Sequence, residues 1–180
     1  GAAAPAAVSR VGLGRATPCV GGATGYTGGA FAGRRAAAGH TVRALAQTAE
    51  TEAELRGRGH TPGPATLSDV DVLRQEAANA DAVVWSVLSL NPADYPLMEG
   101  ALAALNDALA DSNKPLLYMG AGMIYASADE PIGEEGPPDR SDPVSVSGTR
   151  TERNALGGAR RGGGHLGMPS RLGYGRSGWV

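Results

Sequence analysis

The chain has 180 residues, of which 19% are charged, with a formal net charge of −2 and a pI near 5.9. No basic footprint indicates nucleic acid as a partner, and no run approaches the ~18 apolar residues of a membrane span. The single cysteine, Cys19, excludes an intramolecular disulfide framework and a cysteine-cluster metal site, and we expect it to be buried. The length is sufficient for one domain with its own core.

The apolar content is dominated by small residues, and aromatic residues make up only 4% of the chain. Because alanine buries little area, the predicted core is thin, and the fold is either marginal or helped by a partner chain, such as a second copy in a homodimer. The start of the chain lacks the charged region of a secretory signal, so residues 1–15 are expected to form a loose tail and the location to be cytoplasmic. His40, His60 and His165 stand far apart without carboxylates at ligand spacing, and we expect no metal site.

The first half of the chain alternates between apolar and polar stretches. It is predicted to contain a strand at 16–20, a helix at 26–38, a strand at 41–46, a short helix or loop at 48–58 and a strand at 65–67. Pro18 is unusual within a strand, because proline cannot donate to a ladder. Gly39 and His40 end the first helix, and Ser68 is a candidate N-cap for a helix that runs through Ala78.

The second half continues the alternation and contains the clearest elements. It is predicted to contain a strand at 81–90, a helix at 96–109, a strand at 115–119, an acidic, proline-rich loop at 127–143 and a helix at 147–156. The continuous apolar run at 81–90 favours a sheet that is covered on both faces. Strands that alternate with helices imply βαβ units, so the sequence predicts an α/β fold with a parallel sheet.

A glycine motif, Gly22-Ala-Thr-Gly-Tyr-Thr-Gly28, lies between the first strand and the first helix. The first glycine of such a motif permits a tight turn, the second lets the backbone approach a pyrophosphate, and the third lets the helix pack closely on the strand. The helix N-terminus offers unpaired N–H groups and a partial positive charge to the anion. The motif therefore predicts a dinucleotide site at this turn.

In this context the sequence resembles the extended and atypical short-chain dehydrogenases/reductases, which include the NAD-dependent epimerase/dehydratases and the NmrA-like proteins. The matching stretches keep their order along the chain: Gly22–Gly28, Ala38–Leu45, Leu67–Asp69, Ala80–Trp85, Lys114–Tyr118, Tyr125, Glu134-Glu135 and Arg150–Arg153. The resemblance implies a Rossmann-like, doubly wound parallel sheet of five or six strands with helices on both faces. It also implies NAD(P) binding and, for many members, hydride transfer or sugar-nucleotide epimerisation and dehydration on a small-molecule substrate.

The resemblance covers residues 16–156, which we interpret as the NAD(P)-binding domain. Residues 157–180 are rich in glycine and arginine, and Pro169–Arg176 is faintly similar to the sixth strand of the family and the loop after it. Only 24 residues follow Leu156. Most of the substrate subdomain is therefore expected to be missing, through truncation at the C-terminus.

The resemblance also implies a set of cofactor contacts. They are Gly22, Thr24, Gly25, Tyr26, Thr27, Gly28, Arg43, Gln47 and Leu67. NAD usually needs an acid after the second strand to bind the ribose hydroxyls, and here that strand is followed by Gln47. Arg43 is either a contact for the 2′-phosphate of NADP or a solvated charge, so the cofactor is NAD or NADP with a slight preference for NADP. The family's adenine-side acid falls at Thr66, and Asp69 nearby is explained by a helix cap.

Family members that transfer hydride use Tyr-x-x-x-Lys and an upstream hydroxyl, because the lysine lowers the pKa of the tyrosine that exchanges the proton. The hydroxyl position falls at Ala121 here. The tyrosine falls at Val144 or Val146, and the lysine at Gly148 or Arg150. The usual triad is therefore not found.

The nearest substitutes for the triad are Tyr125 and Ser147, although packing alone would also explain both residues. Three functions remain open: an NAD(P)-dependent oxidoreductase or epimerase, a non-enzymatic NAD(P)-binding regulator of the NmrA-like sort, and a structural remnant that binds nothing.

Overall fold

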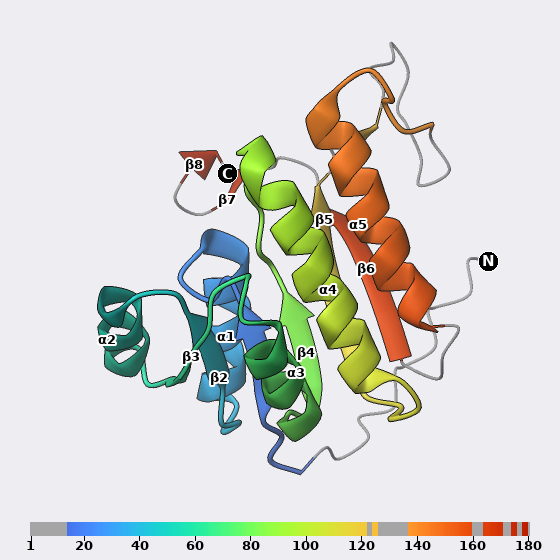
Figure 1. Cartoon of the computed structure of the whole chain (residues 1–180). Coiled ribbons are helices and arrows are strands. Elements are labelled where there is room, and N and C mark those ends of the chain that lie inside the picture. Colours follow the sequence, from blue (N-terminus) through green and yellow to red (C-terminus); the bar gives the residue numbers. More distant parts are fainter. Residues whose placement is uncertain are drawn as a thin grey trace, which may run out of the picture.

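The computed structural model describes residues 14–121, 124–125, 137–159, 164–170, 174–175 and 178–179. Six parallel strands form one sheet in the order β3-β2-β1-β4-β5-β6 (Figure 1). The strands are β1 (Pro18–Gly21), β2 (Arg43–Ala46), β3 (Thr61–Pro64), β4 (Ala82–Trp85), β5 (Pro115–Ala121) and β6 (Gly164–Ser170). A separate antiparallel pair consists of β7 (Tyr174–Gly175) and β8 (Gly178–Trp179).

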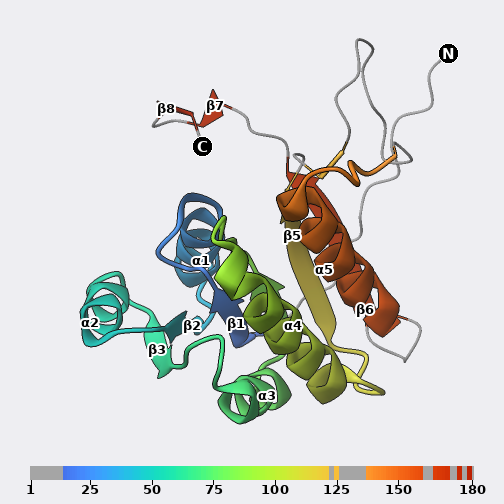
Figure 2. The same cartoon turned by 45° about the horizontal axis from the view of Figure 1, so that its top comes forward.

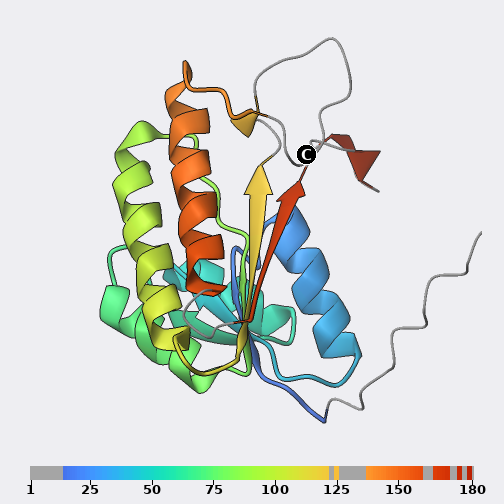
Figure 3. The same ribbon diagram turned by 90° about the vertical axis from the view of Figure 1, so that its right-hand side faces the viewer.

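Helices cover both faces of the sheet, as expected for a doubly wound α/β fold. They are α1 (Tyr26–Ala37), α2 (Ala49–Gly57), α3 (Val70–Asn79), α4 (Tyr95–Leu109) and α5 (Pro143–Ala159), with a short 3-10 helix, η1 (Pro92–Asp94), before α4. Figure 3 views the sheet edge-on, with α1 on one face and α3, α4 and α5 on the other. Figure 2 shows α5 lying over β5 and β6, while α2 lies at the opposite end of the sheet beside β3. The predicted fold class is confirmed.

Two apolar clusters lie on the two faces because side chains alternate along each strand. Trp85 and Leu116 face α3, α4 and α5 and join the larger cluster, which includes Leu102 and Leu105 of α4. The smaller cluster, under α1 and α2, is built largely from alanines around Val20. Small side chains let α1 pack close to the sheet, which places its N-terminus at the end of β1.

The expected third strand at 65–67 is wrong, because β3 lies at Thr61–Pro64. The N–H of Thr61 donates to the carbonyl of Val42, just before β2, and the N–H of Ala65 donates to the carbonyl of Ala46, the last residue of β2, at 2.9 Å each. In a parallel pair every second residue donates to the neighbouring strand, so Pro62 and Pro64 occupy the positions that face away from β2. Because β3 is the edge strand, the missing proline N–H groups cost no ladder bond.

Other boundaries differ from expectation in smaller ways. Pro18 is the first residue of β1, a position that tolerates proline. The strand expected at 81–90 pairs only over Ala82–Trp85, and the helix expected at 147–156 extends over Pro143–Ala159. The N-cap of α3 is Asp69 rather than Ser68, and the Asp69 carboxylate accepts the N–H and the hydroxyl of Thr66, at 2.7 Å each.

Some expectations fall partly or wholly outside the described residues, among them most of the tail at 1–15 and most of the loop at 127–143. β6 lies within the segment 157–180 and begins before the Pro169–Arg176 stretch. Across the described ranges, no helix combines the length and the apolar character needed to cross a membrane.

Candidate functional site

The turn between β1 and α1 brings three backbone segments into contact. Gly22 has a φ of +77°, and a Cβ atom built on it would lie 2.3 Å from the carbonyl oxygen of Ser86, after β4. A Cβ atom on Gly28 would lie 2.3 Å from the carbonyl oxygen of Gly22. Both distances are shorter than any real contact of a Cβ atom, so the turn can form in this shape only with glycine at these two positions.

No side chain caps the N-terminus of α1. Its N-cap is Gly25, which has no side chain to accept a hydrogen bond, and the first turn contains no acid. The N–H of Gly25 donates to Gly22 at 3.0 Å, and the N–H of Gly29 donates to Gly25 at 2.8 Å. The partial positive charge of the helix end is therefore available to an anion from outside the chain.

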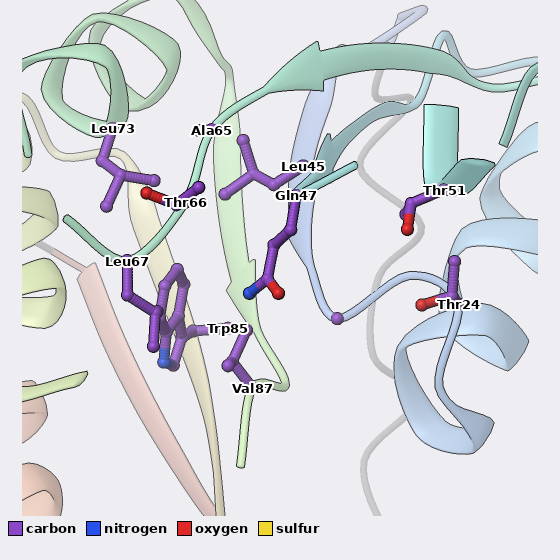
Figure 4. Close-up of a pocket in the computed structure, with 11 residues that line it drawn as sticks. Thr24, Leu45, Gln47, Thr51, Ala65, Thr66, Leu67, Leu73, Trp85 and Val87 are labelled. Carbon is purple, nitrogen blue, oxygen red and sulfur yellow. The ribbon is translucent and has the colours of Figure 1, made fainter. Parts of the chain in front are cut away.

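A cavity of about 160 Å³ lies next to this turn, at the carboxyl ends of the central strands. It is lined by Gly22, Thr24, Leu45, Gln47, Thr51, Ala65, Thr66, Leu67, Leu73, Trp85 and Val87. Figure 4 shows the apolar side chains of Leu67, Trp85 and Val87 on one side, the hydroxyls of Thr24 and Thr51 on the other, and Gln47 between them. In open α/β sheets, this edge is where ligands bind.

Most of the expected cofactor residues lie at this place. Gly22, Thr24, Gln47 and Leu67 line the cavity. Gly25, Tyr26, Thr27 and Gly28 form the N-cap and first turn of α1. The structure adds Thr51 and Val87, which the sequence analysis did not single out. Thr51 lies in the first turn of α2, three residues after the N-cap Thr48, and no sequence motif indicated it.

Arg43 lies elsewhere. It begins β2, whereas Gln47 follows the other end of that strand, and Arg43 is not among the residues that line the cavity. Its guanidinium donates two hydrogen bonds to the carboxylate of Glu76 on α3, each 2.5 Å long. This hydrogen bonding raises the pKa of Arg43 above its ordinary value. The side chain is thus held by a partner inside the protein.

The β5–α5 region holds the two candidate catalytic residues. Tyr125 is half-buried and forms an isolated bridge with Pro138. Ser147 is buried, and its hydroxyl has no hydrogen-bond partner in the described part of the chain. A Cβ atom on Gly148 would lie 2.5 Å from Cγ2 of Ile124, so the segments that carry the two candidates touch each other.

Tyr118 and Arg150, the other groups near β5 that correspond to a tyrosine or a lysine of the triad, are poorly suited to exchange protons at neutral pH. Tyr118 is buried, and burial followed by the charge of Glu152 raises its pKa to about 12. Burial also raises the pKa of Glu152, which moves the pKa of this carboxyl toward neutral pH. Arg150, one of the two positions expected for the lysine, is exposed and pairs with Glu99 of α4 at 2.9 Å. Among the described residues, no three His, Cys, Asp or Glu side chains gather into a group that could hold a metal ion.

No family model matches the chain. An uncharacterized protein of Schizosaccharomyces pombe is 29% identical over 110 residues, which cover 59% of this chain and 37% of that protein.

Solved structures match most of the described fold. A candidate epimerase from Burkholderia cenocepacia J2315 is 27% identical, with a TM-score of 0.67 over 82% of this chain and 51% of that one. The enzyme WbmH from Bordetella bronchiseptica, solved in complex with NAD+, is 17% identical, with a TM-score of 0.71 over 88% and 56%. UDP-N-acetylglucosamine 4-epimerase from Bacillus cereus is 18% identical, with a TM-score of 0.71 over 86% and 59%.

These likenesses confirm the resemblance inferred from the sequence at the level of the fold. The chain has the Rossmann-like fold of the NAD-dependent epimerases and the short-chain dehydrogenase/reductase superfamily. It spans about half the length of the solved structures that it matches.

Proposed function

We propose that the chain binds a nicotinamide dinucleotide, with the pyrophosphate against the first turn of α1 and the adenosine part in the adjoining cavity. The observation that carries this proposal is the turn itself. Gly22 and Gly28 leave no room for a Cβ atom, and the helix that follows begins without a cap or an acid. A bound nicotinamide would supply hydride chemistry, and the described residues would bind and orient it.

The groups around Gln47 support NAD over NADP. The preference for NADP rested on Arg43, and that guanidinium is already paired with Glu76. At the carboxyl end of β2 the cavity offers the uncharged side chains of Gln47 and Thr51, which can hydrogen-bond to ribose hydroxyls. The first turn of α2 also carries Glu50 and Glu52, which would repel a 2′-phosphate.

A role as a binding protein without turnover is the second candidate. The β5–α5 region supports it, because Tyr118 has a pKa of about 12, Arg150 pairs with Glu99, and Tyr125 and Ser147 are the remaining hydroxyl candidates. An oxidoreductase or epimerase would need an acid–base group there.

The test is a titration with NADH and NADPH. Binding is measured by calorimetry and by energy transfer from Trp85, which lines the cavity, to the nicotinamide. We expect saturable binding of both, with NADH at least about tenfold tighter, which corresponds to about 1.4 kcal/mol. Trp85→Phe should remove most of the fluorescence signal, and calorimetry then measures the effect of this cavity change on the affinity itself. No binding of either dinucleotide would overturn the proposal.

Arg43→Met tests the cofactor preference. The variant leaves the Glu76 carboxylate, only 13% exposed, without its partner, so it should lose about 1–2 kcal/mol of stability to urea. The ratio of NADH to NADPH affinity should change by less than about twofold, because the side chain lies away from the cavity. A selective loss of NADPH binding would instead place Arg43 at a 2′-phosphate.

Turnover separates the enzyme from the binding protein. With a panel of carbonyl compounds, cofactor oxidation by a binding protein should stay below ~10⁻² s⁻¹, far under the enzyme median of ~10 s⁻¹. Faster turnover that Ser147→Ala or Tyr125→Phe abolishes would make the chain an oxidoreductase and identify its proton donor.

A further inference from the structure

We propose that Arg58, directly after α2, is a positioning residue for the pyrophosphate: it holds the carbonyl of Ala23 and thereby directs the next backbone N–H, that of Thr24, toward the cavity. This inference rests on the proposed function. Arg58 lies outside the glycine motif and does not line the cavity. It would act through the backbone of the turn.

The contact joins segments that are 35 positions apart in the sequence. Nη1 of Arg58 donates to the carbonyl oxygen of Ala23 at 3.4 Å, and Nη2 donates to Oε1 of Glu54 at 2.5 Å. Ala23 is buried, at 1% exposure, in the middle of the turn. Glu54 lies one helical turn before Arg58, so α2 holds the guanidinium in place while the guanidinium holds the turn.

The geometry of the peptide unit carries the effect to the other side of the turn. The described chain contains no cis peptide bond, and in a trans peptide the C=O and N–H groups point in opposite directions. The C=O of Ala23 points toward Arg58, so the N–H of Thr24 in the same peptide plane points away from Arg58. Thr24 lines the cavity at the side next to the first turn of α1, where its N–H would meet an oxygen of the pyrophosphate proposed there.

Gly29 gives an independent sign that the turn makes room for the guanidinium. A Cβ atom on Gly29 would lie 3.0 Å from the carbonyl oxygen of Ala23 and 3.3 Å from Nη1 of Arg58. An added methyl group would therefore crowd both partners of the contact. Gly33, one turn further along α1, has nothing within 4 Å of the same position. Glycine inside a helix is unfavourable, and only Gly29 of these two has a contact that explains it.

A neighbouring ion pair serves as a matched control. Arg56 pairs with Glu52 at 2.7 Å, also four residues apart on α2, and among the described residues Arg56 makes no hydrogen bond or ion pair with the turn. Arg56→Met and Arg58→Met each remove one exposed ion pair from the same helix. Only Arg58→Met also releases the carbonyl of Ala23.

The first measurement is amide hydrogen exchange in the protein without ligand. Arg58→Met should speed exchange of the Gly25 and Gly29 amides about fivefold, because the turn opens more often. Arg56→Met should leave these amides unchanged. Gly29→Ala should speed exchange of the Gly25 amide to a similar extent, whereas Gly33→Ala should not. Thermal unfolding should show that both arginine variants remain folded, with similar midpoints.

The second measurement compares ADP with adenosine, since only ADP carries the pyrophosphate. Arg58→Met should weaken ADP binding about fivefold to tenfold and adenosine binding less than twofold. Arg58→Lys, which keeps the charge and one donor, should recover part of the ADP affinity. Arg56→Met should bind both compounds like the wild type.

The outcomes separate this inference from the proposed function. If the wild-type protein binds neither ADP nor NADH, the proposed function fails, and the exchange rates alone decide whether Arg58 orders the turn. If the wild type binds both but Arg58→Met matches Arg56→Met in exchange and in affinity, the role of Arg58 is overturned. An equal loss of ADP and adenosine affinity would also overturn it, because the defect would then not concern the phosphates.

Discussion

Helices α1 and α2 end in the same way but begin differently. At their C-termini, Gly39 and Gly59 have φ values of +88° and +80°, and the following residues, His40 and His60, donate their N–H groups back to the last turn at 3.1 and 2.9 Å. At its N-terminus α2 is capped by the hydroxyl of Thr48, which accepts a hydrogen bond from the N–H of Thr51 at 3.2 Å.

The difference at the N-termini shows which helix is prepared for a ligand. The first turn of α2 contains Glu50 and Glu52, so this helix neutralises its own positive end. The first turn of α1 contains no acid, and Gly25 offers no cap. Such groups would stabilise either helix, and of these two helices only α1 lacks them, which leaves its N-terminus for an anion.

The largest effect is expected from Gly22→Ala, which breaks the site at α1. The methyl group would lie 2.3 Å from the Ser86 carbonyl oxygen, and the backbone would keep a left-handed φ. We expect a loss of at least about 2 kcal/mol in the free energy of unfolding, together with loss of NADH binding.

Gly39→Ala is the matched control, since Gly39 is also left-handed but has nothing within 4 Å of the added atom. It should cost about 1 kcal/mol through the backbone alone and leave NADH affinity unchanged. Urea unfolding and NADH titration measure both effects. If Gly22→Ala binds NADH normally, the bare turn is not the phosphate site.

Gly25→Asp sharpens the comparison, because it gives the N-terminus of α1 an acidic group of the kind that α2 already has. The carboxylate should stabilise the helix by about 0.5 kcal/mol and weaken NADH binding at least about tenfold through repulsion of the pyrophosphate. A Cβ atom at this position lies 3.2 Å from the Gly22 carbonyl oxygen, so the backbone must shift by a few tenths of an ångström.

Gly25→Asn has nearly the same shape without the charge and separates repulsion from steric effects. The converse change, Thr48→Ala at α2, should cost about 1 kcal/mol of stability and leave NADH affinity within about twofold. Equal NADH affinities for the Asp and Asn variants would contradict an anion site at this helix end.

The smallest effect concerns the two histidines after the helices. Nδ1 of His40 accepts the N–H of Ala16 at 3.1 Å, whereas Nδ1 of His60 is buried without a partner among the described residues. Burial first, and then the charge of Arg58, lowers the pKa of His60. The folded state therefore binds fewer protons than the unfolded state, whose imidazole has a pKa near ~6.5.

This contribution to stability is fully present above ~pH 6.5 and is lost as the pH falls through the lowered pKa of folded His60. The free energy of unfolding should therefore decrease as the pH falls from about 7 to about 5 in the wild type, and decrease less in His60→Leu. Urea unfolding across this range measures the difference. Identical slopes for the two proteins would assign the pH dependence to other groups.

The sequence predicted the central part of the fold well because its signals are local. The turn at Gly22–Gly28, the helix after it and the apolar run that contains β4 each follow from neighbouring residues. β3 escaped prediction, because Pro62 and Pro64 are tolerated only at a sheet edge, and edge position is a property of the whole sheet. β4 ends at Trp85, because the next residue, Ser86, lies against Gly22 in the turn after β1. This contact joins distant segments, so the apolar run at 81–90 could not predict where the strand ends.

In the candidate site, too, some residues were predicted from a local motif and others depend on contacts between distant segments. The glycines could be read from their spacing, while the pairing of Arg43 with Glu76, 33 residues later, depends on how α3 packs beside β2. The contact between Arg58 and Ala23 spans a similar separation. Residues that act through such long-range contacts do not belong to a sequence motif. The sequence alone therefore identified the glycine turn but not the residues whose side chains contact its backbone.

Cys19 gives the chain an internal reporter of global unfolding. It is the single cysteine in the sequence, it is fully buried on β1 between β2 and β4, and burial raises the pKa of its thiol to about 12. An alkylating reagent needs the thiolate, which this environment suppresses. Labelling should therefore follow the rate at which the middle of the sheet separates, so the kinetic stability of every variant could be measured without introducing a probe.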